Sequence, residues 1–231
     1  IAKKCQWQST QNRIKRKKTM SLKKISVDFY FDYSCPWTYL GFKRLIQTAT
    51  RTASDIIWKP INLEIIREIL DKPKAITTDY QKNYRKKDLQ DWANYCNVVI
   101  NQMENIDHSI SMAASRGVAH AEGEDLIKEY SEEVFKAFFS ESKDISDKKV
   151  LLEISEKIGL NGNFEDSLDD HSLDLVIEEN SKELAQRGGY GSPTMFVENQ
   201  MFFGNDRMNL VEFAIGQASG RVLVIPGQHN T

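Results

Sequence analysis

A single cysteine occupies the place where a strand pattern passes into a helix pattern. Residues 24–31 alternate and are rich in β-branched and aromatic side chains, whereas residues 37–46 repeat apolar side chains at helical spacing after Pro36. Cys35 lies at this junction. The free N–H groups at a helix N-terminus stabilise a negative sulfur, so we expect Cys35 to have a lowered pKa and a reactive thiol. The alternative is that Cys35 is a small apolar residue of the core.

A glycine-rich segment precedes a proline that opens another strand pattern. Residues 188–191 read GGYG and lead into Ser192 and Pro193, after which residues 194–197 favour a strand. A proline at the start of a strand that faces a strand-to-helix cysteine resembles the arrangement of thioredoxin-like proteins. There, a cis peptide bond leaves the backbone N–H and C=O of the preceding residue free to pair with a bound peptide. We therefore predict that the Ser192-Pro193 bond is cis and faces Cys35.

The composition is that of an ordinary globular protein. Of the 231 residues, 40% are apolar and 28% are charged. No apolar run is long enough for a membrane span, and none follows the basic N-terminus as a secretory signal does. We therefore expect a cytoplasmic protein that does not contact a membrane.

Charge is divided unevenly along the chain. Residues 1–24 contain nine Lys or Arg and no acid, which leaves 22 basic against 33 acidic residues in the remainder. An acidic body argues against broad nucleic-acid binding by the folded part, because phosphate contacts need clustered cations. We expect residues 1–23 to form a basic, disordered tail.

Cysteine and histidine spacing argues against a metal site. The three cysteines (Cys5, Cys35 and Cys96) are odd in number and far apart, so a disulfide framework or a thiolate zinc site is not expected. The four histidines lack metal-ligand spacing, and we expect each to be an isolated surface residue: His108, His120, His171 and His229.

The predicted order of elements is βαβ, a long helical block, and ββα. A second strand is expected at 55–61, and helical periodicity continues from 62 to 186. The expected elements after it are helices at 79–95, 109–116, 122–140, 147–158 and 173–186, a hairpin over 194–203 and a closing helix at 206–216. This order predicts a split α/β domain formed by residues 24–61 and 188–231. Residues 62–187 then form a helical insertion domain whose last helix packs on the sheet.

Three separated blocks carry a resemblance to a known family. Residues 29–41, FYFDYSCPWTYLG, look like the opening of the 2-hydroxychromene-2-carboxylate isomerases and the kappa-class glutathione transferases. Residues 134–147 resemble the insertion-domain signature of these enzymes, and residues 191–208 resemble their C-terminal signature. The blocks appear in the right order, and the resemblance covers about residues 24 to 216.

The resemblance implies a DsbA-like thioredoxin fold with a large helical insertion, a glutathione site, an aromatic small-molecule substrate and a homodimer. It also implies roles for individual residues. Ser192 and Pro193 would bind the backbone of glutathione, Asn205 and Asp206 would hold its γ-glutamyl end, and Lys59 and Asn62 would make further contacts. We expect the aromatic substrate near Trp37, Tyr39 and Tyr84, which are alternatively plain core residues. Asp206 is alternatively a helix cap.

The sequence departs from this family at Cys35, where the resembling enzymes normally have a serine that donates a hydrogen bond to the glutathione thiolate. In DsbA-like oxidoreductases the same position is the attacking cysteine, but Thr38 replaces their second cysteine here. A glutathione-dependent isomerase, in which a neutral Cys35 or the Ser34 hydroxyl donates, is the first hypothesis. A single-cysteine thiol-disulfide oxidoreductase or kappa-like transferase is the second. A binding protein without turnover is the third.

Overall fold

A four-stranded mixed sheet lies at the centre of the molecule, in the order β2-β1-β3-β4. The computed structural model describes residues 23–71, 78–101, 106–160 and 162–220. The strands are β1 (Ser26–Phe31), β2 (Asp55–Pro60), β3 (Thr194–Val197) and β4 (Gln200–Phe203). β1 runs parallel to β2 and antiparallel to β3, which is antiparallel to β4. The helix α2 (Pro36–Thr52) connects the parallel pair.

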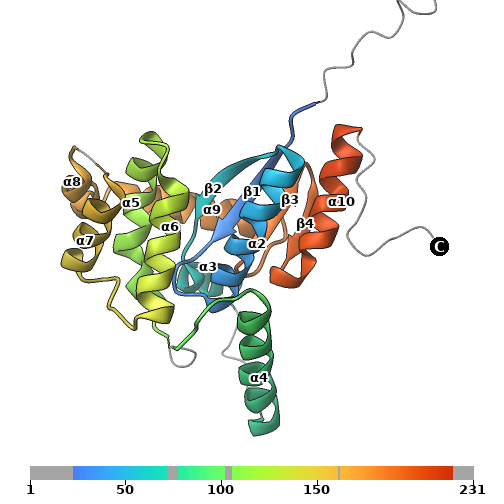
Figure 1. Ribbon diagram of the computed structural model, residues 1–231, viewed down its shortest axis with the longest axis horizontal. Helices are drawn as coiled ribbons and strands as arrows, with labels where there is room; N and C mark the ends of the chain where they lie inside the picture. Colours follow the sequence, from blue (N-terminus) through green and yellow to red (C-terminus); the bar gives the residue numbers. More distant parts are fainter. Residues whose placement is uncertain (1–22, 72–77, 102–105, 161, 221–231) are drawn as a thin grey trace, which may run out of the picture.

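Side chains of β1 alternate between two cores because successive residues of a strand point to opposite faces. Phe29 and Phe31 belong to the larger core, on the face that α2 covers, and both rings meet Trp58 edge-on at 5.9 Å. Tyr30 belongs to a smaller cluster with Ile66 of α3 (Leu63–Ile69) and Leu184 of α9 (Leu173–Gln186). The central strand is therefore buried on both faces (Figure 1).

A helical lobe lies beside the sheet and shares the larger core with it (Figure 1). Its helices are α5 (Met112–Gly123), α6 (Ile127–Phe135), α7 (Lys148–Ile158) and α8 (Phe164–Asp169). Tyr39 of α2 stacks on Phe135 of α6 at 5.3 Å and on Phe139 at 6.0 Å. The aromatic core thus continues from the sheet into the lobe without a polar boundary.

A π-helical turn, η2 (Lys136–Ser140), extends α6, and Glu141 N–H donates to Lys136 C=O. Three successive residues of this turn, 137 to 139, are buried. Phe138 and Phe139 of this turn both belong to the larger core.

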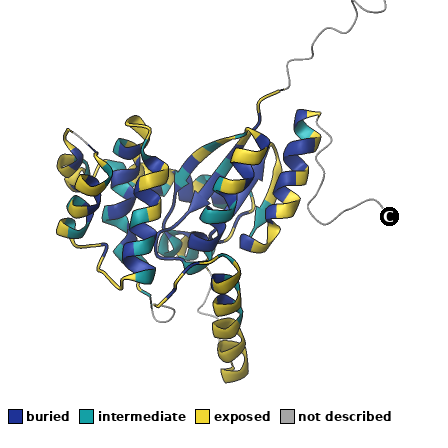
Figure 2. Cartoon of the chain, viewed as in Figure 1, coloured by how far each residue is buried: buried dark blue, intermediate teal, exposed yellow. Residues whose placement is uncertain are grey.

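The helix α4 (Asp79–Tyr95) extends away from the rest of the molecule (Figures 1 and 2). A capping box fixes its start, because Thr78 accepts from Gln81 N–H while the Gln81 side chain accepts from Thr78 N–H. Only Leu89 and Ala93 are buried, and both belong to the C-terminal half of the helix. The polar N-terminal half is exposed along its length.

Two short helical turns, η1 (His108–Ser111) and η3 (Asn205–Arg207), precede α5 and α10 (Met208–Ser219). The predicted helices at 79–95 and 173–186 are confirmed, and the helix predicted over 122–140 is confirmed for residues 127–140 but begins too early. α5 ends at Gly123, and Asp125 adopts a left-handed conformation with φ of 58° before α6 begins. The sequence patterns did not single out α3 and α8.

Several predictions concern residues outside the described ranges, namely residues 1–22 of the basic tail, residues 221–231 and His229. The division into two domains stays a prediction. Within the described residues, no helix is both long enough and apolar enough to span a membrane. The same part of the chain holds no cluster of three or more His, Cys, Asp or Glu side chains placed to bind a metal ion.

Candidate active site

Cys35 is the N-cap residue of α2 and faces the bend at Ser192. Its Sγ donates to the Ser192 carbonyl oxygen at 3.3 Å, and the Ser192-Pro193 peptide bond is cis. The Thr38 Oγ1 lies 2.5 Å from the Ser192 Oγ, which also accepts from Asp32 N–H at 3.1 Å. The predicted pairing of the cysteine with a cis-proline bend is confirmed.

Gly41 lets α2 pack directly on this bend. A Cβ atom at position 41 would lie 2.9 Å from Cγ and 3.3 Å from Cβ of Pro193, closer than such atoms normally approach. The absence of a side chain at position 41 therefore permits the spacing between α2 and the loop that carries Ser192.

Cys35 is 7% exposed. Burial raises the pKa of Cys35 to about 11 and the negative charge of Asp32 adds to the rise, although hydrogen bonds from Thr38 lower the pKa in part. The lowered pKa that we expected from the helix N-terminus is therefore wrong, because loss of solvation outweighs the helix. At neutral pH the thiol is uncharged and acts as an S–H donor.

A buried carboxylate organises the loop before Cys35. Asp32 is fully buried, and its Oδ1 accepts from the Ser34 N–H at 2.8 Å and the Ser34 hydroxyl at 2.7 Å. Its Oδ2 accepts from Leu63 N–H at 2.8 Å, which ties the loop to the start of α3. The Ser34 hydroxyl hydrogen is therefore engaged, and the prediction that Ser34 donates to a ligand sulfur does not fit this geometry.

His108 approaches the same serine from η1, with Nδ1 2.6 Å from the Ser34 Oγ. The expectation that His108 is an isolated surface residue is wrong. His171 and His120 also have partners, Asp174 and the Phe164 ring respectively. No sequence spacing signals the His108 contact, because 74 residues separate it from Ser34.

A pocket of about 360 Å³ lies beside the start of α2. It is lined by Trp37, by Asp88 and Trp92 of α4, and by residues 203–207. Three predicted residues thus meet at one place, since Trp37, Asn205 and Asp206 all line this pocket. We call this cavity the outer pocket.

Asn205 and Asp206 differ in their exposure and in their partners. Asn205 is buried, and both its backbone oxygen and its side-chain oxygen accept from the Arg44 guanidinium, the latter at 3.3 Å. That guanidinium lies 4.9 Å from the ring centre of Trp92. The Asp206 carboxylate is 44% exposed and pairs with Arg207 at 2.9 Å. Asn205 therefore shapes the pocket, whereas Asp206 presents a charge at its surface.

The family model of the DSBA-like thioredoxin domain matches residues 26–216. The chain belongs to this family. A 2-hydroxychromene-2-carboxylate isomerase of Pseudomonas putida is 29% identical over 196 residues, which are 83% of this chain and 94% of the relative. A solved 2-hydroxychromene-2-carboxylate isomerase superposes with a TM-score of 0.72 at 27% identity, covering 84% of this chain and 95% of that one. A probable DsbA oxidoreductase of Streptomyces coelicolor, 16% identical, has a TM-score of 0.71 over 87% of this chain and 92% of its own.

The predicted DsbA-like fold is thereby confirmed, with the sheet order and helical lobe described above. Lys59 lies on the face of this DSBA-like sheet opposite α2, where its Nζ pairs with Glu183 of α9 at 2.7 Å. Asn62 is the N-cap residue of α3, and its amide nitrogen donates to the His108 carbonyl at 3.0 Å. Neither side chain lines the outer pocket, and the ligand contacts of both stay a prediction.

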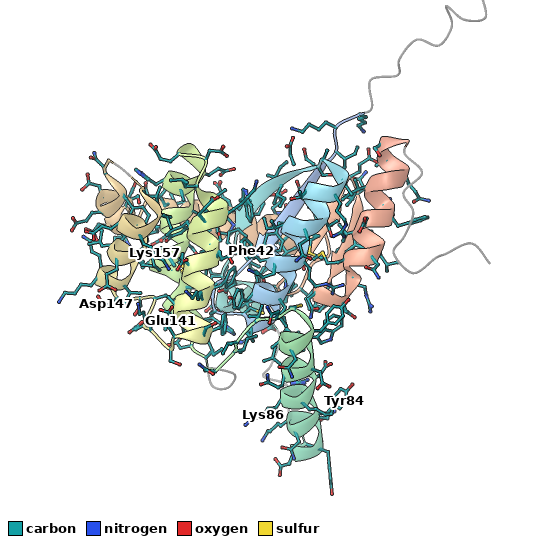
Figure 3. The ribbon with its side chains drawn as sticks, in the orientation of Figure 1. Phe42, Tyr84, Lys86, Glu141, Asp147 and Lys157 are labelled. Carbon is teal, nitrogen blue, oxygen red and sulfur yellow. The ribbon has the colours of Figure 1, made fainter. Side chains whose placement is uncertain are left out.

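Two of the three aromatic residues predicted to bind substrate lie elsewhere in the DSBA-like fold. Tyr39 is 5% exposed and stacks within the aromatic core, so it is a core residue. Tyr84 is 66% exposed, on the part of α4 that extends away from the rest of the molecule (Figure 3). Only Trp37 remains beside the site, because it alone of the three lines the outer pocket.

Proposed function

We propose that this protein is a glutathione-dependent isomerase of the 2-hydroxychromene-2-carboxylate type, acting on an aromatic small molecule. The observation that carries the proposal is the neutral Cys35 thiol at the N-terminus of α2, paired with the cis-proline bend and next to Trp37 of the outer pocket. The names of the relatives support it, because the match spans 94% of the Pseudomonas putida isomerase. The resemblance also leads us to propose a homodimer.

The residues present fit glutathione. Ser192 offers a backbone N–H that has no hydrogen-bond partner among the described residues, beside the carbonyl that accepts from Cys35. Asp206 offers a half-exposed carboxylate, the group that a primary ammonium requires. The outer pocket falls within the range of about 300–1,000 Å³ that is usual for small-molecule sites. Ser192 would therefore hold the peptide part and Asp206 the γ-glutamyl ammonium.

Bound glutathione supplies a thiol that adds reversibly to an activated double bond, so that rotation about this bond becomes fast. The protein's part is to stabilise negative charge at that sulfur. In the free protein the neutral Cys35 donates its S–H to the Ser192 carbonyl oxygen, and it can turn that S–H to a negative ligand atom beside it. The N–H groups of the first turn of α2 favour the same charge. Burial of Cys35 excludes water from this contact, which strengthens it.

The alternative reaction, thiol-disulfide exchange at Cys35, requires the cysteine to be the attacking thiolate. A pKa of about 11 leaves little thiolate at neutral pH, and the Thr38 hydroxyl at the second cysteine position pairs with Ser192. Both features favour the isomerase over the oxidoreductase and over a transferase that uses Cys35.

The test is to incubate the protein with 2-hydroxychromene-2-carboxylate, with and without glutathione, and to follow isomerisation by absorbance. A parallel assay measures exchange with glutathione disulfide. We expect isomerisation that depends on glutathione and no mixed disulfide on Cys35 by mass spectrometry. Rapid formation of that mixed disulfide without isomerisation would instead establish the oxidoreductase. Inactivity in both assays would contradict both enzyme proposals.

A further inference from the structure

The hydrogen bonds around Ser34 determine which nitrogen of His108 carries hydrogen. A serine hydroxyl has one hydrogen, and Ser34 donates it to Asp32 Oδ1 at 2.7 Å. Asp32 accepts from three donors and donates none, which is the pattern of an ionised carboxylate. The Ser34 oxygen, at 2.6 Å from Nδ1, must then accept from His108. His108 therefore carries its hydrogen on Nδ1.

This assignment leaves the other nitrogen with a free lone pair in the neutral ring. Nε2 of His108 has no hydrogen-bond partner in the described part of the chain, and the ring is partly exposed. Imidazole is the side chain that exchanges protons near neutral pH, and the bond at one nitrogen determines the role of the other. Ser34 directly precedes Cys35, so the ring is anchored to the residue next to the cysteine.

The proposed reaction needs an acceptor for one proton, because glutathione binds as a thiol and acts as a thiolate. Cys35 is protonated and donates, so it cannot serve. Asp32 is fully buried and occupied by three donors, and Lys59 pairs with Glu183 on the opposite face of the sheet. His108 remains as the basic group held at this loop.

We propose that His108 Nε2 accepts the proton of the glutathione thiol and that Asp32 and Ser34 hold the ring in the required tautomer; this inference rests on the function proposed above. The S–H bond breaks and leaves its electron pair on sulfur, while the proton forms an N–H bond at Nε2. The proton returns to sulfur before glutathione leaves. No oxidant or further reactant is involved.

Acidic side chains lie in the surroundings of His108. Asp32 acts on it through Ser34, and Asp107 is its neighbour in the chain, with a carboxyl pKa held below its usual range by hydrogen bonds from Ser109. Glu64, in the first turn of α3, adds an acid on a helix packed against η1. The His108 carbonyl also accepts from the amide of Asn62, which fixes the backbone.

The first measurement is the tautomer in the free protein. Nitrogen-15 spectra, with His108 assigned by its loss in His108→Asn, should show hydrogen on Nδ1 and none on Nε2. Asparagine keeps a donor near the position of Nδ1 and lacks a basic nitrogen, so the Asp32 and Ser34 bonds can persist. A ring protonated only on Nε2 would overturn the inference, whether or not glutathione binds.

The second measurement is the ultraviolet absorbance of the glutathione thiolate in the complex at neutral pH, where Cys35 contributes none. We expect the signal in wild type and in His171→Gln, a matched variant of a histidine that pairs with Asp174. In His108→Asn the thiolate absorbance should disappear, and kcat should decrease by about 10²-fold or more. Melting temperature and calorimetric affinity for S-methylglutathione, which has no thiol proton, should not change.

The outcomes separate the two proposals. Thiolate absorbance and kcat that are unchanged in His108→Asn would overturn the role of His108 and leave the isomerase intact. Failure of wild type to bind either glutathione or S-methylglutathione would overturn both. A lowered melting temperature with an unchanged thiolate signal would assign His108 a structural role only, and this too would overturn the inference.

Discussion

Two parts of the candidate site are built in opposite ways. In the loop before α2, Asp32 and Ser34 are fully buried and Cys35 nearly so, and each has a hydrogen-bond partner. In the outer pocket, the side chains of Asp206 and Arg207 are 44% and 51% exposed and pair with each other. The groups suited to the reaction are thus fixed before a ligand arrives, whereas those suited to binding are solvated. Substitutions in the loop should affect rate, and those in the pocket should affect affinity.

The largest effect is expected at Cys35. Cys35→Ala removes the donor to a negative sulfur and should lower kcat of isomerisation by about 10²–10³-fold, the usual effect of losing one such donor. Cys35→Ser should retain or raise activity, because a hydroxyl is the stronger donor. Steady-state kinetics at saturating glutathione measure both variants. Equal loss in the two variants would show that the S–H is not the donor.

Titration of the same thiol tests its environment. Since burial raises the pKa of Cys35 to about 11, alkylation by iodoacetamide should accelerate only as pH approaches that value. A glutathione analogue with a negative group at sulfur should raise the pKa further, because a like charge nearby disfavours a second thiolate. Mass spectrometry of the Cys35 peptide separates its alkylation from that of Cys5 and Cys96. A pKa that does not respond to the analogue would mean that the two sulfurs are not neighbours.

Asp206→Ala should act on binding alone. Loss of a charge-assisted contact to an ammonium should weaken glutathione affinity by about 1.5–3 kcal/mol, measured by calorimetry. The helix-cap role is not supported, because Arg207 holds the N-cap position of α10 and no side chain caps it. The melting temperature should therefore change little, since an exposed ion pair stabilises weakly. Unchanged affinity would remove Asp206 from the site.

Gly41→Ala should affect the fold around the loop. The new methyl group overlaps Pro193, and overpacking of this kind costs about 1–3 kcal/mol in the free energy of unfolding. Gly123→Ala, where no atom lies within 4 Å of the added Cβ, is the matched control and should not destabilise the protein. Urea unfolding of both variants measures the difference. Equal stabilities would show that α2 can move away from the bend without cost.

The sequence patterns predicted those features that depend on local chemistry. The junction at Cys35, the cis bond before Pro193 and the helices at 79–95 and 173–186 each follow from a short run of residues. The patterns predicted the break between α5 and α6 at residues 117–121, whereas the chain turns after Gly123, where Asp125 adopts a left-handed backbone conformation.

Features that depend on distant contacts were not predictable in this way. The pKa of Cys35 depends on burial, which Ser192, 157 residues away, helps to create. His108 forms a hydrogen bond with Ser34, from which it is separated by 74 residues, and Lys59 pairs with Glu183, from which it is separated by 124 residues. In each case the residue type indicated which chemistry the side chain can perform. The residue that it contacts, which determines what it does here, comes from a distant part of the chain.

The π-helical turn at Lys136–Ser140 makes the number of residues in this segment as important as their identity. Its hydrogen bond from Glu141 N–H to Lys136 C=O spans one residue more than an α-helical bond does, and Phe138 and Phe139 of this turn are both buried. Deleting one residue here would shorten the turn to α-helical spacing and shift its side chains relative to the core. Phe139 would then lose its ring stack with Tyr39 of α2. We therefore expect this segment to tolerate substitution more readily than deletion.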